Sequence, residues 1–239
     1  MKMWQTKNGI HIYQVLKGRS NSHLISTEKG NILVDTGKSS AYKRLRQNVD
    51  SINIKSSMID LLILTHSHYD HCQNAFAISG QDLCKIAMSE KEAEFAAQGF
   101  TTLPKGTFGI TRIISGLGSL IGQRRFGYHP FSPDILISKD SELINYGVGI
   151  SLILTEGHSR GSVSVIVDNE IALVGDAMIG TYKNTVFPPF ADDIQKMIKS
   201  WGRLLETECV TFLPGHGKEI NRKLLQQEYN KYSLKLNPK

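Results

Sequence analysis

Residues 60–71 read DLLILTHSHYDH, an apolar run that leads directly into three histidines and an aspartate. The apolar run predicts a buried β-strand, and in extended backbone residues two positions apart point the same way. His66 and His68 are therefore expected to bind one metal ion together, whereas Asp70 and His71 turn into the next helix and face a second point nearby. The alternative is a polar loop in which Asp70 only caps that helix, but it would leave three crowded imidazoles without a partner.

Three later segments have the same form, a predicted strand that ends in a residue with a metal-binding side chain. These residues are His158, Asp176 and His216, after the predicted strands 150–155, 171–174 and 210–213. A glycine beside each residue permits a sharp turn and close approach of the backbone. Each residue alone is a weak signal. The four strand ends together supply five histidines and two aspartates, which is enough for two divalent metal ions that share a carboxylate.

The rest of the chain predicts a mixed α/β protein, because strands dominate the first third and helices alternate with strands later. Further strands are predicted at 9–15, 23–26, 31–34, 85–88, 135–138 and 162–167, and helices at 39–49, up to residue 78, at 191–206 and at 221–236. Ser89 and Glu92 resemble a capping box before another helix, and Asn221 is the expected cap of the last helix. We expect one domain over residues 1–239.

A glycine-rich segment without acidic residues, at about 100–133, interrupts this pattern. Long segments of poor periodicity inside a compact domain are often lids or binding loops. We expect the segment to be a lid over the metal-binding site, and a surface insertion without such a role is the alternative.

Composition excludes several classes of protein. With 239 residues, of which 40% are hydrophobic and 21% charged, the chain is suited to a packed core rather than to disorder. No apolar run is long enough to span a membrane, and the first residues do not resemble a secretory signal. Three scattered cysteines do not form a disulfide framework, so a cytoplasmic location is expected. A net charge of +6 without basic runs makes nucleic acid an unexpected partner and keeps anionic small molecules among the expected substrates.

The candidate residues and their order resemble the metallo-β-lactamase-fold family of hydrolases over nearly the whole chain. The matching stretches are Asp35-Thr36-Gly37, His66-Ser67-His68-Tyr69-Asp70-His71, His158, Gly175-Asp176 and Gly215-His216-Gly217. The resemblance implies an αββα sandwich, in which two mixed β-sheets pack between helices and a dinuclear metal centre lies at one edge. It also implies zinc as the metal, with Mn²⁺ or Fe²⁺ as alternatives.

The same resemblance implies a role for each residue of the site. The first metal ion would be bound by His66, His68 and His158, the second by Asp70, His71 and His216, and Asp176 would bridge the two. Asp35 would hold ligands in place through hydrogen bonds. A hydroxide held between the metals would attack the substrate, and Asp70 would also accept its proton.

Departures from the family pattern narrow the range of expected substrates. True β-lactamases of this fold usually carry cysteine or serine where this chain has Asp176, so the chain resembles the glyoxalase II-like and lactonase-like branches more closely. We therefore expect hydrolysis of a small-molecule ester, thioester or lactone. Tyr182 is a candidate for polarising the substrate carbonyl, with simple packing as the alternative. Arg160 is a candidate for binding a carboxylate or phosphate, with a surface ion pair as the alternative.

Other functions stay open at this point. Hydrolysis of a small phosphodiester is the second choice, since a hydroxide between two metals also attacks phosphorus. A single-iron enzyme that oxidises persulfides and a binding module without catalysis are less favoured, because the chain carries a complete set of candidate ligands.

Overall fold

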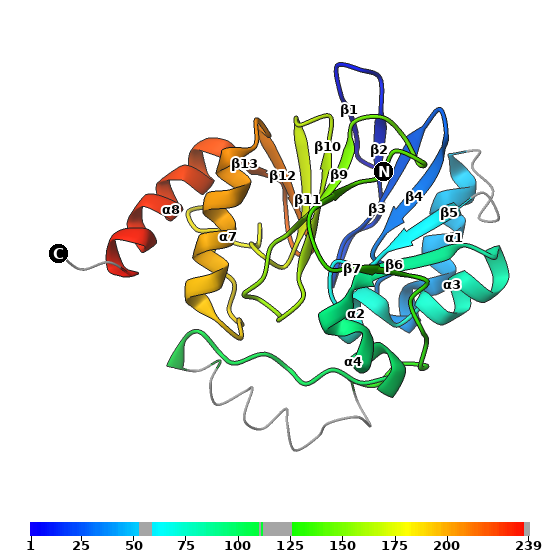
Figure 1. Cartoon of the computed structure of the whole chain (residues 1–239), viewed down its shortest axis with the longest axis horizontal. Coiled ribbons are helices and arrows are strands. Elements are labelled where there is room, and N and C mark those ends of the chain that lie inside the picture. The colour runs from blue at the N-terminus through cyan, green and yellow to red at the C-terminus, as the bar shows by residue number, and fades with distance from the viewer. Residues whose placement is uncertain (53–58, 110, 112–125, 237–239) are drawn as a thin grey trace.

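The chain folds into two β-sheets packed face to face, as the computed structural model shows (Figure 1). The structure describes residues 1–52, 59–109, 111 and 126–236. The 7-stranded sheet has the order β1-β2-β3-β4-β5-β6-β7, and the 6-stranded sheet the order β13-β12-β11-β10-β9-β8. The strands are β1 (Met3–Gln5), β2 (His11–Leu16), β3 (Ser22–Thr27), β4 (Gly30–Val34), β5 (Ile59–Ile63), β6 (Lys85–Ser89), β7 (Ile135–Ile137), β8 (Ser141–Glu142), β9 (Ile150–Leu154), β10 (Val163–Val167), β11 (Ile171–Gly175), β12 (Thr211–Pro214) and β13 (Ile220–Asn221).

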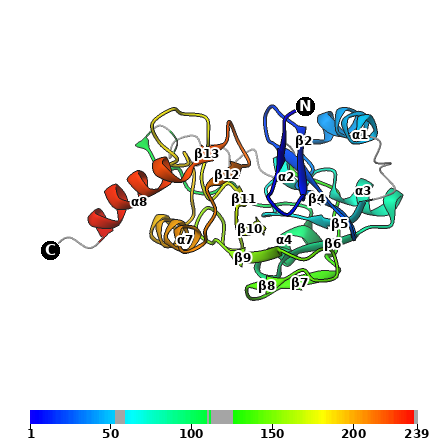
Figure 2. The ribbon, with the colours of Figure 1, turned by 90° about the horizontal axis from the view of Figure 1, so that it is seen from above.

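Helices cover the outer face of each sheet, which gives the αββα sandwich that the sequence predicted. They are η1 (Ser39–Ala41), α1 (Tyr42–Ser51), α2 (Tyr69–Cys72), α3 (Ala75–Asp82), η3 (Glu90–Glu92), α4 (Ala93–Gln98), α7 (Ile194–Glu206) and α8 (Arg222–Leu236). The view from above separates the two outer layers, with α1 and α3 beside the 7-stranded sheet and α7 and α8 beside the other (Figure 2). No described helix is long and apolar enough to cross a membrane.

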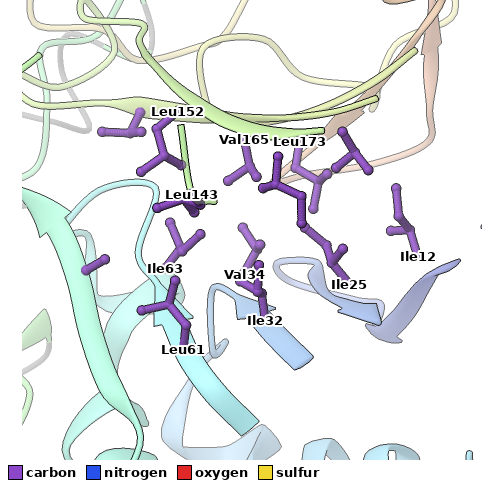
Figure 3. Close-up of a cluster of buried hydrophobic side chains, with 14 of the residues drawn as sticks. Ile12, Ile25, Ile32, Val34, Leu61, Ile63, Leu143, Leu152, Val165 and Leu173 are labelled. Carbon is purple, nitrogen blue, oxygen red and sulfur yellow. The ribbon is translucent and has the colours of Figure 1, made fainter. Parts of the chain in front are cut away.

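Strand β5 is buried on both sides because its side chains alternate between two apolar layers. Leu61 and Ile63 belong to the core between the sheets, together with Val165 of the facing sheet (Figure 3). Leu62 and Leu64 belong to the core under the helices of the 7-stranded sheet. Burying one such side chain contributes about 1.5–3 kcal/mol. The strand that leads to the histidine cluster is thus held firmly from both faces.

Helix α7 packs on the 6-stranded sheet through apolar residues three and four positions apart. Met197, Trp201 and Leu204 are all fully buried in this layer. The indole of Trp201 also donates a hydrogen bond of 2.6 Å to the carbonyl of Ala177. The helix therefore fixes the backbone directly after Asp176.

The predicted elements are confirmed in most places, and the departures have local causes. Helix α7 begins at Ile194 rather than at 191, because Asp193 is its cap and accepts a hydrogen bond of 3.0 Å from the backbone N–H of Lys196. Asn221 caps α8 as predicted, through a bond of 2.9 Å from the N–H of Leu224. The short strands β1, β8 and β13 were not predicted, because two or three residues do not produce a recognisable alternation.

The predicted capping box at Ser89 and Glu92 forms only in part. The hydroxyl of Ser89 accepts a hydrogen bond of 3.3 Å from the N–H of Lys91. The side chain of Glu92 is fully buried and contacts Ser67 and Gly161 instead of the cap. The prediction was wrong for Glu92, because the spacing of a capping box does not show whether the acid faces the helix end or the interior.

Parallel pairing brings the polar strand ends together. β4, β5 and β6 run parallel to one another, and β11 runs parallel to β12 in the other sheet. Their carboxyl ends therefore open at one edge of the sandwich, where the loops after them meet.

Candidate metal centre

All seven predicted ligands gather at this edge of the sandwich. Their donor atoms form three groups in which all atoms lie within 4.8 Å of one another: His66, His68 and His158; His66, His71 and Asp176; and Asp70, His71 and His216. The groups share His66 and His71, so they form one continuous cluster rather than three separate sites. The loop after β5 supplies His66 and His68, and the short helix α2 that follows it supplies Asp70 and His71. The loops after β9, β11 and β12 supply one residue each.

The unsatisfied atoms of this cluster fit a divalent metal. His66 Nε2 and Asp176 Oδ1 are buried and have no hydrogen-bond partner. His158 Nε2 lies 3.0 Å from His68 Nδ1, so two ring nitrogens face each other at close range. Buried polar atoms without partners are rare and destabilising. Imidazole nitrogens and carboxylate oxygens that converge on one point are the donor set of zinc and related ions.

Hydrogen bonds behind three of the ligands fix which nitrogen His66, His71 and His158 present. Thr65 Oγ1 lies 3.0 Å from His66 Nδ1, and the carbonyl of Phe190 lies 2.9 Å from His158 Nδ1. Asp35 Oδ2 lies 2.8 Å from His71 Nδ1, in agreement with the expected role of Asp35. The carbonyl of Phe190 and the carboxylate of Asp35 accept only, and the Thr65 hydroxyl gives its proton to Asp35. Nδ1–H is therefore the donor in each pair, which leaves Nε2 free to bind a metal.

Asp35 reaches this position through an uncommon backbone conformation. Its φ of 59° lies in the left-handed region, which non-glycine residues seldom adopt. Its carboxylate accepts hydrogen bonds from the N–H of Thr65 at 2.9 Å and from the Thr65 hydroxyl at 2.8 Å. One aspartate after β4 thereby fixes both His71 and the residue before His66.

Burial and mutual charge set the protonation states of the cluster. Burial lowers the pKa of His66 and of His68 well below the usual range, so both are neutral at pH 7. Burial alone would raise the pKa of Asp176, but the neighbouring His216 and His71 outweigh it and hold this pKa well below its usual value. Neutral imidazoles and an ionised carboxylate are the forms that bind metal ions.

His71 shows the opposite balance. Burial would lower its pKa, but the carboxylates of Asp176 and Asp35 outweigh burial and raise it well above the usual range. A site that attracts a proton so strongly between two carboxylates also attracts a metal cation at the same nitrogen.

Two glycines allow the ligand loops to approach one another closely. A Cβ on Gly215 would lie 2.3 Å from Asp176 Oδ1 and 2.6 Å from His71 Cε1. Gly175 has a φ of +49°, and a Cβ there would lie 2.6 Å from Thr65 Oγ1. Gly215 therefore lies directly against two ligands, whereas Gly175 lies against Thr65, the residue before His66.

The structure argues against Asp70 as a simple helix cap. The N-cap of α2 is His68, and Asp70 lies inside the first turn. Its Oδ2 is 3.7 Å from His216 Nε2 and 3.9 Å from the Nε of Arg19. The carboxylate thus faces the cluster and the open cleft beside it.

A cleft of about 330 Å³ opens over the cluster. One wall is apolar and consists of two segments, Leu103-Pro104 and Pro188-Pro189-Phe190, which we call the proline wall. The stretch directly after Pro104 is joined to the second segment by two hydrogen bonds of 2.9 Å, from the N–H of Thr107 to the carbonyl of Pro189 and from the N–H of Ala191 to the carbonyl of Lys105. Since the carbonyl of Phe190 also holds His158, the wall has a fixed position relative to the cluster.

Tyr182 and Arg160 occupy different places. Tyr182 lines the cleft together with Asp176 and His216, and its side chain is largely exposed. Arg160 is not among the described residues that line the cleft. Its guanidinium lies 3.9 Å from the ring centre of Phe95 and 3.5 Å from a carboxylate oxygen of Glu94. These contacts favour the surface ion pair over substrate binding for Arg160.

The segment at 100–133 contributes to the cleft through its described part. Leu103 and Pro104 line the cleft, and the hydroxyl of Thr101 donates to Ser67 in the histidine loop at 2.8 Å. Residues 110 and 112–125 lie outside the described residues. The lid therefore stays a prediction.

Sequence reasoning missed several residues of the site. Arg19 lines the cleft and donates a hydrogen bond of 3.0 Å to the hydroxyl of Tyr69. Nothing in its local sequence signals this position. Thr65 and the carbonyl of Phe190 were also missed. The residue between an apolar strand and a histidine ligand is a natural place to look for an outer partner such as Thr65.

This donor set at the edge of an αββα sandwich defines a class of enzymes, the metal-dependent hydrolases. Residues 16–216 match the metallo-beta-lactamase superfamily, and the chain belongs to that superfamily. A probable metallo-hydrolase of Methanocaldococcus jannaschii is 30% identical over 203 residues, which are 83% of this chain and 88% of that protein. The match supports a metal-dependent hydrolase.

More distant comparisons agree on the fold. The beta-lactamase-like protein 2 homolog of Drosophila melanogaster is 24% identical over 210 residues. The match covers 88% of this chain and 62% of that protein. The metallo-beta-lactamase of Cronobacter sakazakii superposes with a TM-score of 0.70 at 17% identity and covers 99% of this chain and 93% of its own. The FEZ-1 metallo-beta-lactamase of Legionella gormanii superposes with a TM-score of 0.65 at 19% identity, over 94% and 92% of the two chains. At these identities the structures show a shared fold alone.

Proposed function

We propose that this protein is a dinuclear metal-dependent hydrolase of a small-molecule ester, thioester or lactone. The observation that carries the proposal is the continuous cluster of seven ligand-type side chains. Three imidazoles suit a first metal, and Asp70, His71 and His216 suit a second. Asp176 Oδ2 lies 3.5 Å from His158 Nε2 of the first set and 3.1 Å from His216 Nε2 of the second, which suits a shared ligand. Zinc is the proposed metal, and Mn²⁺ and Fe²⁺ are the alternatives with the same ligand preferences.

The chemistry divides between the metals and the side chains around them. When bound, the two ions supply a hydroxide at neutral pH and stabilise negative charge on the substrate oxygen. Asp70 Oδ2, which lies beside His216, would accept the proton of the hydroxide as this adds to the carbonyl, and would return it to the leaving alkoxide or thiolate as the acyl C–O or C–S bond breaks. The hydroxyl of Tyr182 at the cleft mouth donates a hydrogen bond to the carbonyl oxygen of the substrate.

We expect an apolar acyl group of the substrate to pack on the proline wall. Its residues line the same cleft as His68, His158 and Asp176, so an acyl chain packed on it places its carbonyl near the proposed metals. Each methylene group removed from water there contributes about 0.8 kcal/mol. We therefore expect kcat/KM to rise with the length of the acyl chain until the wall is covered.

The test combines metal analysis with a substrate screen of the purified full chain. Chromogenic esters, thioesters, lactones and phosphodiesters are compared at equal concentration, with acyl chains of two to eight carbons in the ester series. Two metals per chain and turnover of carboxylic esters, thioesters or lactones support the proposal. Faster turnover of phosphodiesters would favour the second function, one iron per chain would favour persulfide oxidation, and a chain that binds no metal would favour a binding module.

Three further expectations accompany the proposal. A small molecule, with anionic compounds included, is the proposed partner at the cleft, and a cytoplasmic location stays a prediction from the sequence. Nucleic acid is not expected to bind. Binding that weakens steeply as salt is raised would contradict the last expectation.

A further inference from the structure

Glu92 is a buried carboxylate next to the candidate metal centre. It ends η3 and has no exposed surface. Its Oε1 accepts a hydrogen bond of 2.9 Å from the N–H of Gly161. Its Oε2 accepts a bond of 3.2 Å from the N–H of Ser67 and a second bond from the Ser67 hydroxyl. One side chain thus accepts hydrogen bonds from two separate loops.

The two loops carry the three imidazoles of the first proposed metal site. Ser67 lies between His66 and His68, in the loop after β5 of the 7-stranded sheet. Gly161 lies three positions after His158, in the loop between β9 and β10 of the 6-stranded sheet. Glu92 therefore connects the ligand loops of the two sheets.

The groups that donate hydrogen bonds to Glu92 are neutral and belong to a longer network. Thr101 Oγ1 lies 2.8 Å from the hydroxyl of Ser67, and the hydroxyl of Tyr128 lies 2.8 Å from Thr101 Oγ1. Burial raises the pKa of Tyr128, so this hydroxyl keeps its proton. The Ser67 hydroxyl that donates to Glu92 thus belongs to a network of neutral hydroxyl groups. A buried carboxylate without a bonded cation is unfavourable unless other charges compensate it.

The fit around Glu92 leaves no spare room. A Cβ on Gly161 would lie 2.6 Å from Glu92 Cγ and 2.8 Å from the hydroxyl of Ser89. Any side chain at position 161 would therefore push the carboxylate away from the ligand loops.

We propose that Glu92 is a positioning residue of the metal centre. It sets the spacing between the pair His66 and His68 on one loop and His158 on the other, and its negative charge favours a cation at the first site. This inference rests on the proposed metal-dependent function. The proposed role explains why a carboxylate is buried at this position, although an apolar residue would fill the same space without the cost of burying a polar group.

The test compares Glu92→Gln with the matched control Glu94→Gln. Glutamine keeps the volume of Glu92, but its amide group places a donor against either Ser67 or Gly161 and removes the charge. Glu94 is two residues away, and its side chain is 70% exposed. Zinc and cobalt titrations of the metal-free full chain are expected to show a 10- to 100-fold weaker first site in Glu92→Gln, which is typical for outer partners of metal ligands. The control should bind like the wild type.

Two further measurements separate positioning from a purely structural role. The visible spectrum of the cobalt-loaded protein should change in Glu92→Gln, and the rise in Tm on adding metal should shrink. A variant whose Tm falls equally with and without metal, at unchanged metal affinity and spectrum, would overturn the inference.

A second variant keeps the test decisive if Glu92→Gln does not fold. Gly161→Ala retains the charge of Glu92 but displaces its side chain, and it should weaken the first site in the same direction. Unchanged metal affinity in Gly161→Ala would also count against Glu92 as a positioning residue. A wild-type chain that binds no metal would instead refute the proposed function.

Discussion

Replacing Asp35 by asparagine tests whether the outer hydrogen bonds control the metal centre. The carboxylate of Asp35 only accepts hydrogen bonds: from the N–H of Thr65 at 2.9 Å, from the Thr65 hydroxyl at 2.8 Å and from His71 Nδ1 at 2.8 Å. Asparagine has the same shape but replaces one oxygen by an NH₂ group, which only donates. The change therefore alters protonation at an almost constant volume.

Both orientations of the asparagine are unfavourable. If its NH₂ faces His71, Nδ1 must accept, and the ring proton moves to Nε2, the atom 3.5 Å from Asp176 Oδ1. If its NH₂ faces Thr65, a buried N–H loses its acceptor, which costs about 1–3 kcal/mol. Loss of an outer partner typically weakens metal binding 10- to 100-fold, or by about 1.4–2.7 kcal/mol.

Metal stoichiometry and affinity are measured by titration of Asp35→Asn, with exposed Asp140→Asn as the control. We expect the site that contains His71 to lose affinity by this factor, while His66, His68 and His158 still bind one ion. The pKa of His71 should fall as the Asp35 charge is removed. Two metals bound with wild-type affinity, together with wild-type turnover, would refute the role of Asp35.

Three further predictions follow from other parts of the structure. Asp70→Asn should fold, keep at least the first metal and lose at least about a hundredfold in kcat, since general acid–base catalysis contributes about 10²–10⁴-fold; near-wild-type rates with both metals bound would contradict a catalytic role. Arg160→Gln should leave KM unchanged and lower the free energy of unfolding in chemical denaturation by no more than about 1 kcal/mol, because the contacts of this side chain with Glu94 and Phe95 lie at the surface. A large rise in KM would show that Arg160 binds substrate. Burial lowers the pKa of His23 from 6.5 to about 3, so the unfolded chain binds more protons between these values and stability is lost as the pH falls through 6.5. Denaturation at pH 7, 6 and 5 should show His23→Leu losing less stability than the wild type, by up to about 1.4 kcal/mol per pH unit, and parallel losses would contradict the assignment.

The fold and the candidate ligands could be predicted because their signals are local. The alternation of Leu61 and Ile63 against Leu62 and Leu64 marks a strand buried on both faces. The histidines and aspartates follow directly after such strands, and parallel strands bring their carboxyl ends together. Local pattern and global arrangement therefore agree at these positions.

The outer parts of the site could not be predicted, because they depend on contacts between distant segments. The two segments of the proline wall lie far apart in the sequence, and hydrogen bonds such as that from Thr107 to Pro189 connect their surroundings. Glu92 has the spacing of a capping residue, and its inward turn depends on Ser67 and Gly161. The sequence pattern around Arg160 does not reveal that Phe95 lies beneath its guanidinium.

The strand ends lie at two opposite edges of the sandwich, which we call rims. Amino-acid substitutions have different consequences at the two rims. The loops that follow β4, β5, β9, β11 and β12 all open at the metal-binding rim, so insertions and substitutions there alter chemistry. The turns at the other ends of these strands, such as Thr27–Gly30 and Asp168–Asn169, contact no candidate ligand through any described hydrogen bond. Descendants of this sequence could therefore acquire new substrates on one rim while the other rim accumulates stabilising changes, and the two histories would be nearly independent.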